Sequence, residues 1–217
     1  MSKKSSILED PIFQTLVGAI SAFVARITKL KVAGSYAQAL DEINRALEDL
    51  IGLKSNQLLS LTDGFILDLL TVNEYLDIQR LWFLAELINA EGEIKRAHRL
   101  KSTGIKNQVR AMGFFLETAF ASQATIPQVD TQINALFGRL GEELSEDLLF
   151  NLFDHFDQRG NYLNAVTSLD LMLAGTNQIS EIQEERTKYL QLLLQIAESE
   201  LNLGGLTIAE VKGKLSS

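Results

Sequence analysis

The chain has 217 residues, of which 46% are hydrophobic, and a formal net charge of −8. The apolar fraction is ordinary for a globular protein and excludes a disordered chain. The acidic balance opposes nucleic-acid binding, because phosphates attract a basic surface. The lack of cysteine excludes disulfides and thiolate zinc sites and fits a reducing compartment. With no signal peptide or bilayer-spanning run evident, we expect a cytoplasmic protein without a membrane partner.

Apolar residues recur at three- and four-residue steps along most of the chain, and no segment shows sustained strand alternation. This periodicity predicts an all-α fold. The first helix is expected to begin with Asp10 as N-cap and Pro11 in its first turn, and to end before Gly34. A second helix over about 36–51 completes an antiparallel hairpin over 10–51.

The middle of the chain predicts a second hairpin. Short helical pieces are expected over 52–73, after which Asn73 caps a long helix. Gly104 is expected to end this helix and to turn the chain into the next one, because glycine adopts turn conformations that other residues resist. The second hairpin then spans about 74–122.

The C-terminal part of the chain predicts a third hairpin and a cap. The hairpin covers about 145–174, with Ser145 as N-cap and Gly160 at its turn. Further helices follow over 177–217, the first of which is expected to run as one long helix to Gly204.

Three stretches, one in each hairpin, repeat a single pattern. A glycine turns the chain, and small or apolar residues follow five, nine and twelve residues later, where they let two helices pack closely. The stretches are Gly34, Tyr36, Ala39, Ile43 and Ala46; Gly104, Lys106, Val109, Gly113 and Leu116; and Gly160, Tyr162, Ala165, Leu169 and Met172.

This spacing resembles the second half of a tetratricopeptide unit. The chain as a whole resembles a bacterial family, common in Firmicutes, of tetratricopeptide-like proteins with no assigned activity, on the stretches 34–40, 51–53, 203–206 and 210–211. The resemblance implies an irregular α-solenoid of helical hairpins with a C-terminal helical cap, in a single domain over 1–217. The glycines lie 70 and 56 residues apart and not at the regular 34-residue period, so the hairpins are interrupted or diverged.

The resemblance also implies a partner-binding face, because the first helix of each tetratricopeptide hairpin lines a concave surface. Counted back from each glycine, the residues facing this groove are Val24, Thr28 and Lys31; Ile94, His98 and Lys101; and Phe150, Asp154 and Asp157. We therefore expect a non-catalytic interaction or scaffolding module that binds a protein or peptide. Its apolar contacts would be Ile94 and Phe150. The basic residues Lys101 and Arg99 would lie on one side of them, and the acidic residues Asp154 and Asp157 on the other. The alternative is that the hairpins close on themselves and leave no groove.

Two other functions stay open. Asp154, His155 and Asp157 are residue types that bind metals, which would suit a metal-dependent enzyme; the plainer reading is a solvated acidic face with one surface histidine. Three successive leucines at 192–194 spread apolar surface around the last long helix, which suits burial in the core or a homo-oligomer contact. The sequence carries no P-loop, nucleophile elbow or zinc-protease motif, so we expect no enzymatic activity and no cofactor.

A basic cluster extends from the end of the second hairpin's first helix into its second helix. Positive charge at a helix C-terminus complements the helix dipole, and arginine also binds carboxylates and phosphates of a partner. Both interpretations fit the cluster. Its members are Lys95, Arg96, Arg99, Lys101, Lys106 and Arg110.

Overall fold

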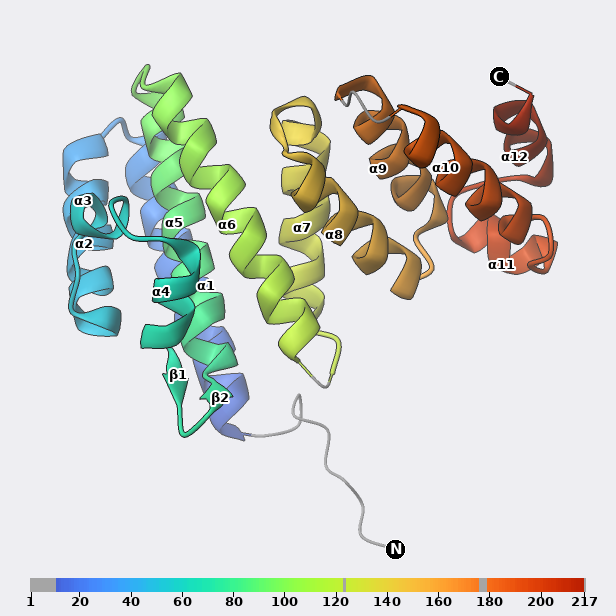
Figure 1. Cartoon of the computed structure of the whole chain (residues 1–217). Coiled ribbons are helices and arrows are strands. Elements are labelled where there is room, and N and C mark those ends of the chain that lie inside the picture. Colours follow the sequence, from blue (N-terminus) through green and yellow to red (C-terminus); the bar gives the residue numbers. More distant parts are fainter. Residues whose placement is uncertain (1–10, 123, 176–178, 217) are drawn as a thin grey trace, which may run out of the picture. The chain divides into compact units, whose positions relative to one another are not determined.

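The computed structural model describes residues 11–122, 124–175 and 179–216. The described chain is almost entirely helical, which confirms the all-α prediction, and it divides into two compact units, Met1–Arg139 (unit 1) and Leu140–Ser217 (unit 2) (Figure 1). The single domain expected over 1–217 stays a prediction. Asp10, the predicted first N-cap, lies outside the described residues. None of the helices described is both long and apolar enough to cross a membrane.

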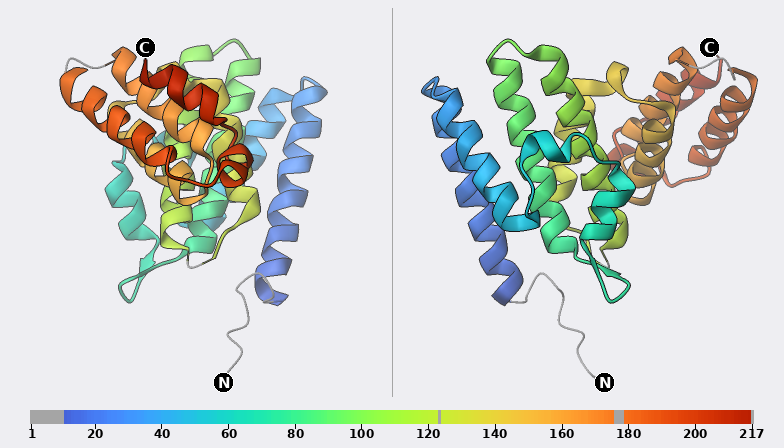
Figure 2. Two further views of the ribbon diagram at one scale, coloured as in Figure 1. Left: turned by 90° about the vertical axis from the view of Figure 1, so that its right-hand side faces the viewer. Right: turned by 60° about the vertical axis from the view of Figure 1, so that its left-hand side comes forward.

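The first hairpin of unit 1 consists of α1 (Pro11–Val32) and α2 (Tyr36–Ile51), which lie side by side in Figures 1 and 2. Gly34 turns the chain as predicted, with a φ of 71°, and the backbone N–H of Ser35 donates to the carbonyl of Leu30 at 2.9 Å. This is the left-handed helix ending that glycine favours. Both helices pack on α5 (Ile78–Ala97).

A small β-hairpin precedes α5, where the sequence predicted no strand and a helix cap at Asn73. Asn73 and Glu74 both have positive φ, 51° and 69°. Two left-handed residues in succession form the tight turn that matches strand twist, so the chain reverses here and the N-cap of α5 is Asp77, which accepts from the N–H of Arg80 at 3.0 Å. The elements before α5 are α3 (Ser55–Leu58), α4 (Asp63–Leu69), β1 (Thr71–Val72) and β2 (Tyr75–Leu76).

The prediction that Gly104 turns the second hairpin is wrong. Gly104 lies inside α6 (Lys101–Ala121), where α6 crosses α5 at Gly92. A Cβ on Gly104 would lie 2.6 Å from the carbonyl oxygen of Gly92, and a Cβ on Gly92 would lie 2.8 Å from that of Gly104. Glycine is therefore required here because a side chain would not fit between the two backbones.

The turn between α5 and α6 is made by Arg99. Its φ is 67°, and the N–H of Leu100 donates to the carbonyl of Lys95 at 2.8 Å, as at the other two hairpin turns. Five residues after each left-handed residue stands a small one packed in the core; the pairs are Gly34 with Ala39, Arg99 with Gly104, and Gly160 with Ala165. The left-handed turn and the small residue five positions later thus recur in all three hairpins, in the second one five residues before the stretch that the sequence indicated. Nine residues after Arg99 stands the polar Gln108, so the rest of the pattern is not kept there.

Unit 2 contains the third hairpin, whose turn glycine, Gly160, has a φ of 66° as predicted. Ser145 caps its first helix by accepting from the N–H of Leu148 at 3.4 Å. The expected long helix up to Gly204 is interrupted after Leu193, and a separate short helix follows. The elements are η2 (Gly141–Glu143), α8 (Glu146–Gln158), α9 (Tyr162–Gly175), α10 (Ile179–Leu193), α11 (Glu198–Leu203) and α12 (Ile208–Leu215).

Substitution of Gly104 by alanine tests the close crossing of α5 and α6. We expect Gly104→Ala to lower the free energy of unfolding by about 2–4 kcal/mol, because the new methyl group must displace backbone. Gly113→Ala in the same helix is the matched control, since a Cβ there meets nothing within 4 Å. It should raise stability by about 0.5–1 kcal/mol through helix propensity. Urea unfolding followed by the fluorescence of Trp82, the chain's one tryptophan, measures both; equal effects would refute the tight crossing.

Candidate functional site

A polar pocket of about 140 Å³ lies in unit 1 between α1, α5 and α7 (Pro127–Leu140). Half of its polar lining residues come from α5, and α1 supplies most of its apolar wall together with Thr28 and one cation, Lys31. The lining residues are Val24, Ile27, Thr28, Lys31, Glu86, Asn89, Ala90, Glu93 and Gln132.

The pocket collects equivalent positions of the first two hairpins. Val24, Thr28 and Lys31, which the sequence assigned to the partner-binding face, stand ten, six and three residues before Gly34. In the second hairpin the turn residue is Arg99, and the residues ten and six positions before it are Asn89 and Glu93. Both line the same pocket. The three predicted residues of α1 therefore border one cavity with Asn89 and Glu93 of α5, which the sequence did not assign to the partner-binding face.

Glu86 is the most perturbed acid of the pocket. Its residue is only 4% exposed, and its carboxylate accepts from Trp82 Nε1 at 3.2 Å and from Gln132 Nε2 at 3.1 Å. Burial raises the pKa of Glu86 to about 7, and the negative charge of Glu93 adds to this effect, against the lowering by the two hydrogen bonds. Within the described part of the chain, no basic side chain pairs with Glu86.

The neighbouring acids of α5 are compensated by cations. Burial opposes the charge of Glu93, but ion pairs with Lys31 and with Arg139, the latter at 3.1 Å, hold the pKa of Glu93 below its ordinary value. Glu91 is buried as well, and it pairs with Lys95 at 2.8 Å. Glu86 differs from both because its partners are neutral.

A chain of side-chain hydrogen bonds, here called the amide relay, ends on Glu86. Arg96 donates to Gln108 Oε1 at 2.7 Å, and Gln108 Nε2 donates to Asn89 at 3.2 Å. Asn89 Nδ2 donates to Gln132 at 3.3 Å, and Gln132 in turn donates to Glu86. Each amide accepts a hydrogen bond from the preceding member and donates one to the next, from the Arg96 guanidinium to the Glu86 carboxylate. The relay therefore links α5, α6 and α7. Because its last member donates to Glu86, it favours the ionised form of that carboxyl.

Glu86 and Gln132 were not among the predicted site residues. The signal for Glu86 is its position as a lone acid in the apolar run 81–88, since an acid in such a run is buried with its helix. No comparable signal marks Gln132, because its role depends on where α7 packs against α5.

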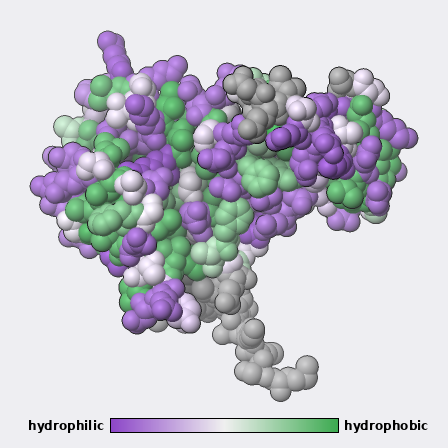
Figure 3. Space-filling model, in the orientation of Figure 1, coloured by the Kyte–Doolittle hydropathy of each residue, from purple (hydrophilic) through white to green (hydrophobic). Residues whose placement is uncertain are grey.

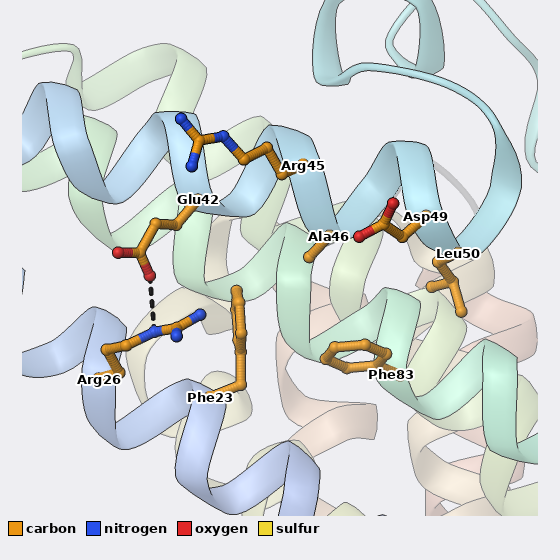
Figure 4. A pocket seen from close by; sticks show the side chains of 8 residues that line it. All are labelled: Phe23, Arg26, Glu42, Arg45, Ala46, Asp49, Leu50 and Phe83. Atoms are coloured by element: carbon orange, nitrogen blue, oxygen red, sulfur yellow. Dashed lines mark ion pairs between the residues drawn. The ribbon is translucent and has the colours of Figure 1, made fainter.

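A second groove, of about 530 Å³, lies between α1, α2 and α5 on the other flank of α1 (Figure 4). The rings of Phe23 and Phe83 meet edge to face at 5.7 Å between its walls. Arg26 pairs with Glu42 at 2.6 Å, and its guanidinium lies 5.3 Å from the centre of the Phe23 ring. The other lining residues are Arg45, Ala46, Asp49 and Leu50. Arg26, Glu42 and the two aromatic rings of this groove thus already contact one another.

The predicted apolar contact Ile94 is wrong, because its side chain is 0% exposed and belongs to the core. The five-residue register error caused this assignment. His98, Arg99 and Lys101 are exposed at the turn between α5 and α6, outside the pocket lining. The ring of His98 lies 5.2 Å from that of Tyr36, and Arg99 makes the turn itself, so two of these three residues have structural roles.

Much of the basic cluster serves internal contacts. Arg110 pairs with Asp63 at 2.6 Å and donates to the carbonyl oxygen of Leu58 at 2.7 Å, which ties the loop before α4 to α6. Lys95 pairs with Glu91, and Arg96 begins the amide relay. These residues hold unit 1 together, and Arg99 and Lys101 remain exposed at its turn.

In unit 2, Phe150, Asp154 and Asp157 lie on α8, and Phe150 is 51% exposed. Asp157 accepts from the hydroxyl of Tyr189 at 2.7 Å. Burial, followed by the nearby charge of Asp157, raises the pKa of Asp154. These positions are exposed or half-buried, as the predicted partner face requires.

The reading of His155 as a surface histidine is wrong. It is 3% exposed, and burial, aided by the charge of Arg159, lowers its pKa to about 4. Its ring packs against Phe156 with centroids 5.6 Å apart. Across the described residues, no three histidine or acidic side chains gather as a metal-ligand set.

Exposed apolar side chains lie on α4 and the β-hairpin of unit 1, and Figure 3 shows a hydrophobic surface over α4. They are Phe65, Leu69, Val72 and Tyr75. Of the three successive leucines at 192–194, Leu193 is buried, Leu194 is half-buried and Leu192 is exposed.

Comparison of the chain with protein-family models, with curated proteins and with solved structures finds no significant match. The family resemblance therefore stays an expectation.

Replacement of Glu86 by glutamine tests its buried charge. Because the folded pKa of about 7 lies above the ordinary value of 4.5, the protein takes up a proton on folding between these values, and stability falls as the pH rises through this window. Glu86→Gln removes this loss and should raise the free energy of unfolding at pH 8 by about 1–2 kcal/mol.

The measurement is urea unfolding of both proteins from pH 5 to pH 8, followed by Trp82 fluorescence. The buried His155 has the opposite slope, since its lowered pKa makes stability fall as the pH drops from about 6.5 to 4. His155 is present in both proteins and cancels in the difference. If Glu86→Gln lowers the free energy of unfolding by the same amount at pH 8 as at pH 5, the raised pKa of Glu86 is contradicted.

Proposed function

We propose that the chain is a non-catalytic protein-interaction or scaffolding module, and that unit 1 binds a protein or peptide through the polar pocket between α1, α5 and α7. The observation that carries the proposal is the lining of this pocket. Val24 and Thr28 of α1 and Asn89 and Glu93 of α5 hold equivalent positions in successive hairpins. In stacked hairpins, such positions form the continuous face that holds a partner.

The size of the pocket favours recognition of one side chain. Pockets that hold whole small molecules measure roughly 300–1,000 Å³, whereas this one measures about 140 Å³. A partner therefore inserts a single group and makes its remaining contacts on the surrounding surface. Lys31 and Glu93, paired at the pocket, give that surface both signs of charge.

We further propose that the three hairpins are tetratricopeptide-like. Their common left-handed turn and the small residue five positions later support this relation. A scaffold of this kind needs no catalytic groups, since its affinity comes from complementary surface. The exposed apolar patch on α4 and the β-hairpin is also typical of proteins that bind other proteins.

Photo-crosslinking tests the partner face. p-Benzoylphenylalanine placed at Thr28, an exposed pocket residue of α1, should form covalent adducts with a partner in cell lysate, identified by mass spectrometry. The same group at Ala22, exposed on α1 but outside both pocket linings, is the matched control and should form few.

A second experiment adds the substitution Ala90→Phe to the variant that carries p-benzoylphenylalanine at position 28. Because the ring occupies the space that a partner's side chain would enter, we expect the adduct yield to fall at least tenfold, with helicity by circular dichroism unchanged. Adducts of equal yield at Thr28 and Ala22, or insensitive to Ala90→Phe, would reject the site. An adduct with a second copy of the chain would identify the partner as the protein itself.

A further inference from the structure

The pocket contains a negative charge that the protein itself does not neutralise. Glu86 accepts two hydrogen bonds, both from neutral donors, Trp82 and Gln132. The basic residue of the pocket lining, Lys31 of α1, pairs with Glu93, as does Arg139 of α7. A buried carboxylate without a cation is unfavourable, and a bound cation would remove that penalty.

We propose that this pocket binds a primary alkylammonium group, of a lysine side chain or of a small amine, with Glu86 as its counterion. The inference rests on the proposed partner face and names the chemistry that this face recognises. It goes beyond that function because it assigns the ligand group and the residue that neutralises it.

The lining suits both ends of such a group. An ammonium group donates three hydrogen bonds, and the pocket offers acceptors at Glu86, Glu93 and the hydroxyl of Thr28. Val24, Ile27 and Ala90 supply apolar surface for the methylene chain. The pocket volume is about 140 Å³. Roughly four to five water molecules fill this volume in the liquid, so an amine with four carbon atoms is of a suitable size.

Other ligand classes fit less well. An anion would meet Glu86 and Glu93, and the one cation in the lining, Lys31, is already paired. A metal ion prefers several acidic or histidine ligands, and among the residues that the structure describes no set of three gathers. A neutral ligand would leave Glu86 uncompensated. The ammonium group satisfies the charge and the hydrogen bonds together.

The charged groups around Glu86 predict how binding depends on pH. Glu93 of α5 faces it with like charge, Lys31 and Arg139 are held by Glu93, and Arg96 acts only through the amide relay. Protonation of Glu86 removes the counterion, and its pKa is about 7. Affinity should therefore fall about thirtyfold from pH 8 to pH 5.5.

Isothermal titration calorimetry of the full chain with n-butylammonium chloride at constant ionic strength tests the proposal. We expect one site per chain at pH 8, with the thirtyfold loss at pH 5.5, and at least tenfold weaker binding of the neutral isostere 1-butanol. Glu86→Gln should abolish binding while keeping the shape of the side chain. Glu42→Gln, a carboxylate change in the second groove, should leave binding unchanged and is the matched control.

The outcomes separate this inference from the partner face. No binding of n-butylammonium at pH 8, equal affinity in Glu86→Gln, or affinity that does not change with pH would overturn the ammonium site, even where Thr28 still crosslinks to a partner. Competition by Nα-acetyl-lysine N-methylamide would support a lysine side chain as the natural source. Binding of n-butylammonium without such competition would support a free alkylamine.

Discussion

The close approach of α5 and α6 at Gly92 and Gly104 determines how unit 1 is built around its candidate site. Because no side chain separates the two backbones there, the amides of α6 reach polar groups of α5 directly. Asn107 donates to Glu91 at 2.8 Å, and Gln108 connects Arg96 to Asn89. A larger residue at either glycine would part the helices and break these contacts.

The amide relay carries this constraint from α6 to the pocket. Buried polar groups stabilise a fold only when each finds a partner, and the relay provides partners up to its last member. That last member, Glu86, is left with neutral donors while Glu93 holds two cations. A protein selected for stability alone would place an uncharged residue there, since an uncompensated buried charge destabilises the fold. Retention of such a charge beside a cavity is the physical basis for a binding role.

Much of the fold can be predicted from the sequence because it depends on local patterns. Periodicity gave the helices, and Gly34 and Gly160 gave two of the three turns, since a left-handed residue there favours glycine. The third turn uses Arg99, which carries no sequence signal, and Gly104 stood nearby with a different role. That substitution displaced the assignment from Asn89 and Glu93 to Ile94 and His98. The β-hairpin at Asn73 was missed because its strands are too short to show alternation.

The candidate site was less predictable than the fold, because it combines helices that are distant in the chain. The predicted α1 residues line the pocket, but Gln132 reaches it only through the packing of α7. The charge state of Glu86 likewise depends on burial and on which acid takes the cations.

The pKa of the Glu86 carboxyl, followed by ¹³C NMR in the full-length chain, tests the central claim most directly. The account predicts a value of about 7. A value near the ordinary 4.5 would mean that Glu86 is hydrated or paired with a cation, and would contradict the uncompensated charge on which the site depends.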